Sequence, residues 1–216
     1  MLFTTACVYG GPSNTLDDCA NVTAGITGGG VAIGASYDFG GGFTTAFGAQ
    51  FSETGIATDE SDDAFALNAA YTADNYGVSI TWATVEDSTG STADNDTYTA
   101  FNGYYSFDNG LNVSAGYELG DLENAAKTVD ETGAYFIGVN AEVGPGELGA
   151  ALGTYGTQKE TATLGVPDRM MYEVYYSYAV NDGMTITPLI YTVEADPADT
   201  SDQDETGIMV KTSFSF

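Results

Sequence analysis

The sequence contains no histidine and only 4 basic residues, against 31 acidic residues in a chain of 216. Without histidine, the chain lacks the commonest general base of enzymes and the commonest neutral metal ligand. The formal net charge of −27 would repel a phosphate backbone, so nucleic acid is excluded as a partner. Because 12% of the residues are aromatic, the composition also differs from that of a disordered acidic segment.

Long apolar segments are missing as well. No run of about 18 apolar residues occurs, so we expect no transmembrane helix. Residues 1–7 lack the basic start and the long apolar core of a secretory signal peptide. We therefore expect Met1 to be an internal or truncated start, with further sequence lying upstream.

Cysteine occurs twice, at Cys7 and Cys19. One such pair within a single loop favours a disulfide in an oxidising compartment. Two unpaired small side chains are the alternative. We expect residues 1–30 to form an external loop or a partial strand that carries this pair.

The main positive signal is the alternation of apolar residues with small or polar ones, a period of two that predicts β-strands. Most of the predicted strands have about 9 to 12 residues, the length that a tilted strand needs to cross a bilayer. Their ranges are 31–39, 43–51, 64–73, 76–85, 97–107, 111–122, 132–143, 147–158, 170–180, 184–195 and 206–216. Tight turns rich in Gly, Asn and Asp alternate with loops of about ten residues, near 52–63, 86–96, 123–131, 159–169 and 196–205. This pattern predicts an all-β fold, an antiparallel up-and-down transmembrane β-barrel with about 11–12 strands present and its short turns in the periplasm.

The two faces of the predicted strands differ in composition. One face is apolar, and aromatic residues gather where it meets the tight turns, as in the girdle of a membrane barrel at the headgroup level. These residues are Phe39, Phe43, Tyr71, Tyr76, Tyr105, Phe107, Tyr178, Phe214 and Phe216. The opposite face is small or polar and holds few charges. A soluble, secreted acidic β-domain also alternates and remains an alternative, but its second face would carry more charge.

Charge is concentrated in the predicted loops, and segment 196–205 alone has five acidic residues. A negative vestibule would concentrate cations and repel anions. Clustered carboxylates could also bind a divalent cation between loops, because they are hard oxygen ligands. The simplest alternative is a solvated surface, and we expect no cofactor.

A few charged residues fall on the small or polar face, where they would line a water-filled pore: Glu118, Glu142, Glu147, Glu173 and Lys211. Paired carboxylates can perform acid–base catalysis. These carboxylates, however, lie on separate strands without a distinctive spacing, and no histidine accompanies them. The pattern therefore favours a pore over an enzyme.

Residues 172–180, the turn Asn181-Asp182-Gly183, residues 184–188 and residues 206–216 together resemble the ending of cyanobacterial outer-membrane porins, a group related to carbohydrate-selective porins with proposed roles in iron uptake. The resemblance implies that residues 31–216 are the C-terminal strands of a barrel of about sixteen strands, often trimeric, in the outer membrane of a Gram-negative-type cell. It also implies that Phe214 and Phe216 resemble the signal read by the barrel assembly machinery. The surface-layer-homology domain that family members carry upstream is not in this sequence.

These features predict an outer-membrane porin, a passive diffusion channel for ions and small hydrophilic solutes that prefers cations. A structural or adhesive barrel with a plugged lumen is an alternative from a different class. It would need longer loops or a filling helix.

Overall fold

The computed structural model describes residues 31–51, 63–87, 94–121, 129–154, 158–161, 169–196 and 201–215. These residues form one β-sheet whose strand pairs are all antiparallel. The strands are β1 (Val31–Gly40), β2 (Phe43–Phe51), β3 (Ala64–Thr72), β4 (Tyr76–Asp87), β5 (Asp94–Ser106), β6 (Leu111–Asp121), β7 (Val129–Val143), β8 (Gly146–Thr154), β9 (Gln158–Thr161), β10 (Met170–Asn181), β11 (Met184–Val193) and β12 (Glu205–Phe214). Within these ranges, no helix is long and apolar enough to cross a membrane.

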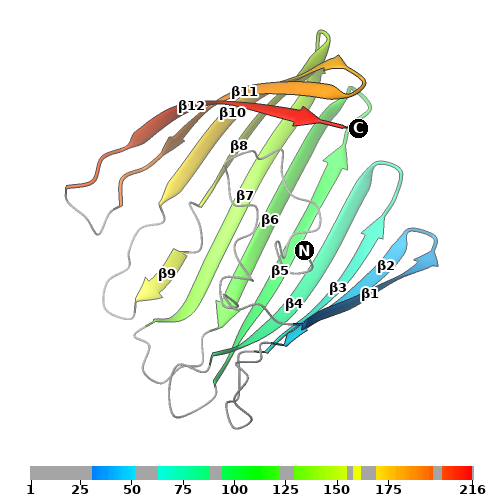
Figure 1. Ribbon diagram of the computed structural model, residues 1–216, viewed down its shortest axis with the longest axis vertical. Helices are drawn as coiled ribbons and strands as arrows, with labels where there is room; N and C mark the ends of the chain where they lie inside the picture. The colour runs from blue at the N-terminus through cyan, green and yellow to red at the C-terminus, as the bar shows by residue number, and fades with distance from the viewer. Residues whose placement is uncertain are drawn as a thin grey trace.

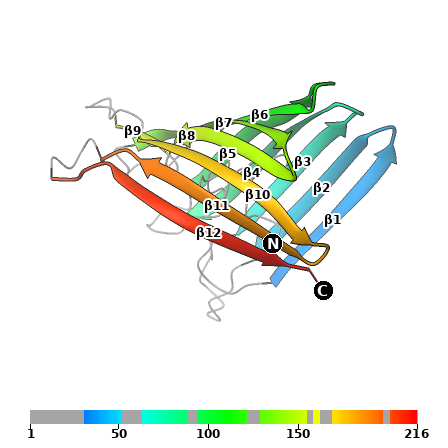
Figure 2. The same cartoon turned by 90° about the horizontal axis from the view of Figure 1, so that it is seen from above.

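Apart from β9, the strands follow one another in sequence order round an arc, with β1 and β12 at its two ends (Figures 1 and 2). The tight turns gather at one end of the sheet, here called the turn end, and we call the opposite end of the strands the loop end (Figure 1). The predicted all-β, up-and-down arrangement is confirmed. Among the described strands, no pairing joins β12 to β1, so the sheet has two edges.

The predicted strand 147–158 is wrong in its last part. The strand β8 ends at Thr154, and β9 is a separate strand that pairs with β7. Phe136 pairs with Gly153, and Gly133 pairs with Gln158. Between these two pairs the chain advances three positions along β7 but five positions from β8 to β9. Two extra residues therefore interrupt the ladder. An insertion of two residues preserves a period of two, which is why alternation alone did not reveal it.

Two of the predicted long loops are shorter than expected, because β5 and β7 each begin three residues before their predicted starts at 97 and 132. The tight turns agree with their residue types. Gly110 and Gly144 have φ values of 82° and 62°, which glycine adopts without a steric penalty. In the turn between β5 and β6, the Asn109 side-chain oxygen also accepts a hydrogen bond of 3.1 Å from the backbone N–H of Leu111.

Burial alternates along the strands and defines two faces. In β6, Ser114, Gly116 and Glu118 are buried, whereas Tyr117 and Leu119 between and beyond them are exposed. We call the buried side the inner face and the exposed side the outer face. Large apolar side chains exposed on the outer face include Ile33, Phe47, Leu67, Val78, Ile80, Trp82, Leu119, Ile137, Val174, Ile190 and Val210.

Aromatic side chains lie on the outer face close to the turn end. The rings of Phe43 and Tyr71 are 4.5 Å apart between centroids, and those of Tyr105 and Phe107 are 4.7 Å apart. The Tyr105 hydroxyl also accepts a hydrogen bond of 3.0 Å from the side-chain amide of Asn75 in the neighbouring turn. Rings with one apolar side and one polar tip suit the boundary between hydrocarbon and water.

Candidate functional site: the inner face of the sheet

The strand register places a row of polar side chains across the inner face near the turn end. Glu142 on β7 is directly opposite Glu147 on β8, and Glu147 is directly opposite Ser177 on β10. The hydroxyl groups of Ser177 and Thr187 are 3.3 Å apart, and Thr187 on β11 is directly opposite Lys211 on β12. We call this set the turn-end row. Its members were separated in sequence by up to 69 positions (142 to 211), and the antiparallel pairing aligns them.

The Glu147 carboxylate is held by two donors on neighbouring strands. The Asn140 side-chain amide donates to Oε2 at 2.6 Å, and the Tyr175 hydroxyl donates to Oε1 at 3.0 Å. Hydrogen bonds to both oxygens fix the orientation of the carboxylate. The paired Glu142 is exposed, so this part of the inner face presents two acidic groups side by side.

Neutral polar pairs continue across the inner face on β3, β4 and β5. The Asn68 amide donates to the Thr81 hydroxyl at 2.8 Å and to the Ile80 carbonyl at 3.2 Å. The Ser79 hydroxyl donates to the Asn102 side-chain oxygen at 2.9 Å. Such cross-strand bonds satisfy polar groups that an apolar core would leave unpaired.

Nearer the loop end, the inner face is more apolar than the sequence indicated. Ala83, Ala100 and Phe136 form one buried cluster, and Ala151, Met171 and Val193 form another. Glu118 and Glu173 are also buried there, at 1% and 2% exposure. The prediction of a uniformly small or polar inner face is therefore wrong in this region, because Phe136 and Met171 point inward.

Inward-facing rings lie against glycines on the adjacent strands. Tyr175 is directly opposite Gly149, and Tyr191 is directly opposite Gly207. A Cβ atom added to either glycine would collide with the ring opposite. The absence of a side chain thus gives each ring room to lie along the sheet instead of projecting from it.

The predicted site residues that the structure describes divide into three groups. Glu118 and Glu173 are buried on the inner face, whereas Glu142, Glu147 and Lys211 belong to the turn-end row. Phe214 is 61% exposed on the outer face, near the turn end. The remaining predicted residues, Cys7, Cys19 and Phe216, lie outside the described residues.

Sequence reasoning missed Asn68 and Tyr175, although each stands at an inward position of its strand. The alternation in β3 could have identified Asn68 as an inward polar residue. For Tyr175, only the register shows that a glycine on β8 makes room for its ring.

A basic side chain joins the segments at the loop end. Arg169 donates through Nε to the carbonyl oxygen of Glu194 at 2.6 Å and through a terminal nitrogen to Asp202 at 3.3 Å. The same Asp202 carboxylate accepts a hydrogen bond of 2.8 Å from the backbone N–H of Asp196. These contacts tie the start of β10 to the connection between β11 and β12.

In the described part of the chain, no group of three His, Cys, Asp or Glu residues is placed to hold a metal ion. Most of the predicted acidic loops lie outside this part. The possible divalent-cation sites between loops therefore remain a prediction.

The solved structures that resemble this sheet include bacterial porins. The fold is the porin fold. An anion-selective porin from Comamonas acidovorans superimposes with a TM-score of 0.71 at 17% sequence identity, over 86% of this chain and 59% of that one. Another porin gives a TM-score of 0.63 at 19% identity, over 85% of this chain and 60% of that one. The outer membrane channel DcaP of Acinetobacter baumannii gives 0.62 at 11% identity, over 98% of this chain and 70% of that one.

The chain thus spans about 60% of the length of the first two porins that it matches. No family model matches the sequence, and no curated protein matches it. At these identities the likeness concerns the fold, so the narrower resemblance to cyanobacterial porins remains a prediction.

Proposed function

We propose that this chain forms part of the wall of a water-filled pore in the outer membrane, through which ions and small hydrophilic solutes diffuse passively. One observation carries the proposal: a single-layer sheet has hydrogen-bonded polar and acidic side chains on one face and exposed apolar side chains on the other. In water, such an exposed apolar surface would be costly, whereas in a bilayer it faces hydrocarbon. The porin fold supports the same arrangement.

We propose further that the pore prefers cations. Glu142 and Glu147 place two acidic side chains side by side at the turn end, and two hydrogen bonds hold the Glu147 carboxylate in position. Lys211, in the same row, is three strand spacings away from Glu147, or about 14 Å at about 4.8 Å per spacing. At that distance salt screens its charge, and an ion near the two glutamates experiences mainly their field. One of the porins with this fold is anion-selective, so the lining, and not the fold, must set the preference.

The proposal includes the setting in which the pore works. The chain contacts the bilayer through its outer face and assembles as a homotrimer. Phe214 and Phe216 form the C-terminal signal for the barrel assembly machinery, in keeping with the exposed position of Phe214 on the outer face. The protein acts as a channel and not as an enzyme.

A planar-bilayer recording of the whole chain in a KCl gradient tests the pore and its selectivity together. We expect stepwise conductance and a reversal potential that indicates cation preference. About 6 Å from a carboxylate in water, a monovalent cation gains about 0.7 kcal/mol and a monovalent anion loses as much, so each of Glu142→Gln and Glu147→Gln should lower the cation-to-anion permeability ratio about tenfold. Asp108→Asn removes the same charge from a turn and is the matched control.

The outcomes separate the two parts of the proposal. A reversal potential that favours anions would contradict cation preference while leaving the pore intact. A cation-favouring potential that both glutamine variants leave unchanged would contradict the role of Glu142 and Glu147 in that preference. Absence of conductance, with β-structure still visible by circular dichroism, would contradict the pore itself.

A second function has one observation in its favour. The burial of Phe136, Glu118 and Glu173 to 1–2% exposure on the inner face is expected if the lumen is filled near the loop end. A structural barrel with a plugged lumen would show this burial and would give no conductance in the same recording.

A further inference from the structure

The two glutamates of the turn-end row are directly opposite each other, but their side chains are held differently. Directly opposite residues have Cβ atoms about 5 Å apart, so two carboxylates at these positions could meet in front of the wall. Glu142 is exposed. Glu147 is partly buried, and each of its carboxylate oxygens accepts a hydrogen bond from a neighbouring strand. Glu147 is thus the fixed member of the pair.

The two hydrogen bonds draw the Glu147 carboxylate along β8. Gly149 lies two residues further on the same strand, about 7 Å nearer the loop end. The two donors, Asn140 and Tyr175, are the residues directly opposite Gly149 on β7 and β10. The ring and the hydroxyl of Tyr175 occupy the space that a Cβ atom of Gly149 would need. Because both donors stand in the row of Gly149, the carboxylate that they hold is turned toward that row and out of the turn-end row.

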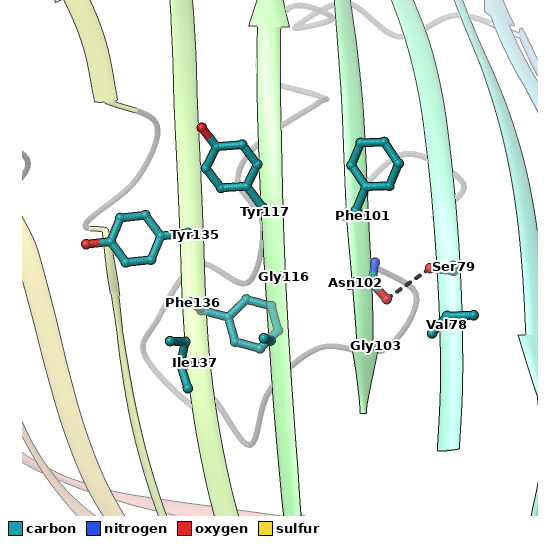
Figure 3. A pocket seen from close by; sticks show the side chains of 11 residues that line it. Val78, Ser79, Phe101, Asn102, Gly103, Gly116, Tyr117, Tyr135, Phe136 and Ile137 are labelled. Atoms are coloured by element: carbon teal, nitrogen blue, oxygen red, sulfur yellow. Dashed lines mark hydrogen bonds between the residues drawn. The ribbon is translucent and has the colours of Figure 1, made fainter. Parts of the chain in front are cut away.

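The hydrogen bonds across β3, β4 and β5 are of another kind, because they join neutral groups. The Ser79 hydroxyl and the Asn102 side-chain oxygen form such a pair, as Figure 3 shows. A pair of this kind satisfies polar groups and fixes no charge. At Glu147, two strands instead contribute donors to one acidic group, and the glycine between them leaves the space in which they meet. The geometry therefore fixes where an acidic side chain of the inner face stands.

The position of Glu147 matters most for doubly charged ions. In water, a further carboxylate about 6 Å away holds a monovalent cation about threefold more tightly and a divalent cation about tenfold more tightly. Carboxylates are also the hard oxygen ligands that Mg²⁺ prefers. With both oxygens of Glu147 engaged and turned out of the row, a cation beside Glu142 meets one carboxylate at close range instead of two. Monovalent cations lose little from this separation, whereas divalent cations lose a position in which they would be retained and obstruct the pore.

We propose that Asn140 and Tyr175 set the specificity of the pore among cations, because they hold Glu147 away from Glu142 and keep the pair from closing on a divalent cation. Both act through Glu147, so they are positioning residues and need not touch the ion. This inference rests on the proposed cation-preferring pore. It adds that monovalent cations pass the turn end and that divalent cations are not retained there.

The test records the K⁺ conductance of the whole chain in planar bilayers while MgCl₂ is added. Tyr175→Phe keeps the ring and removes one donor, and Asn140→Ala removes the other. Each variant should lower the Mg²⁺ concentration that halves the conductance by about five- to tenfold. Adding Glu142→Gln to the Tyr175→Phe chain should restore the wild-type Mg²⁺ dependence, because the released Glu147 then has no second carboxylate beside it. That change would not repair a loosened sheet.

Tyr191→Phe is the matched control. The Tyr191 ring lies against Gly207 as the Tyr175 ring lies against Gly149. Among the described residues, no hydrogen bond joins the Tyr191 hydroxyl to a carboxylate. This variant should therefore keep the wild-type Mg²⁺ dependence.

The possible results separate this inference from the proposed function. If Tyr175→Phe and Asn140→Ala required as much Mg²⁺ as the wild type, the positioning role would be overturned and the cation-preferring pore would stand. Equal sensitivity of Tyr191→Phe, or an effect of Tyr175→Phe that Glu142→Gln did not reverse, would overturn it in the same way. Absence of wild-type conductance, or a wild-type reversal potential that favours anions, would overturn the proposed function and this inference with it.

Discussion

Replacing Phe136 with alanine should lower the free energy of unfolding of the chain in lipid vesicles by about 3–5 kcal/mol. The ring is 1% exposed although it is on the inner face, and it packs against Ala83 and Ala100. Transfer of a buried phenylalanine from water accounts for about 1.5–3 kcal/mol of the effect. The cavity left behind accounts for the rest, because Gly116 and Gly153, directly opposite on the two neighbouring strands, have no side chains to fill it.

Urea unfolding followed by Trp82 fluorescence measures this loss. Ile137→Ala is the matched control, since Ile137 is the next residue, points to the outer face and is 48% exposed. Its truncation should cost about 1–2 kcal/mol. If the free energy of unfolding of Phe136→Ala were within about 1 kcal/mol of the wild-type value, the ring would not be tightly packed on the inner face, and the reasoning would be refuted.

Two other substitutions test contacts between strands and between loops. Gly149→Ala should destabilise the chain by about 1–3 kcal/mol, because the new methyl group collides with the Tyr175 ring. In a double-mutant cycle measured by urea unfolding, Tyr175→Ala should remove most of the cost of Gly149→Ala. If the costs of the two substitutions simply added, the collision would be contradicted. Arg169→Gln should cost about 1 kcal/mol, since its pair with Asp202 is partly exposed. The same urea unfolding at low and high KCl should show that this cost shrinks with salt, and a cost that salt leaves unchanged would contradict an ionic contact between Arg169 and Asp202.

The fold could be predicted from the sequence because the signal for it is repeated along the chain. Each strand alternates, and each tight turn carries Gly, Asn or Asp at the positions that need them, as Gly110 and Gly144 show. The division of β8 from β9 was not predictable in this way. Two inserted residues leave the period of two unchanged, so only the pairing with β7 reveals them.

The candidate site was only partly predictable. Alternation placed Glu142 and Glu147 on the polar face, but it says nothing about which residues of other strands lie beside them. The contacts of Glu147 with Asn140 and Tyr175 depend on register over three strands, which is set by the turns and bulges between them. The burial of Phe136 depends on glycines more than fifteen positions away in sequence, and a pattern read along a single strand does not contain that information.

The direction of the edge strands limits what can complete the sheet. β1 and β12 both run from the loop end to the turn end. The antiparallel path from β1 to β12 contains an odd number of strands, so its first and last strands have the same direction. If these two edges met, they would form a parallel pair in an otherwise antiparallel ladder, and the edges of a second copy in the same orientation would do the same. Any set of strands that closes this sheet with antiparallel pairs throughout must therefore be odd in number. Its first and last strands must both run from the turn end to the loop end.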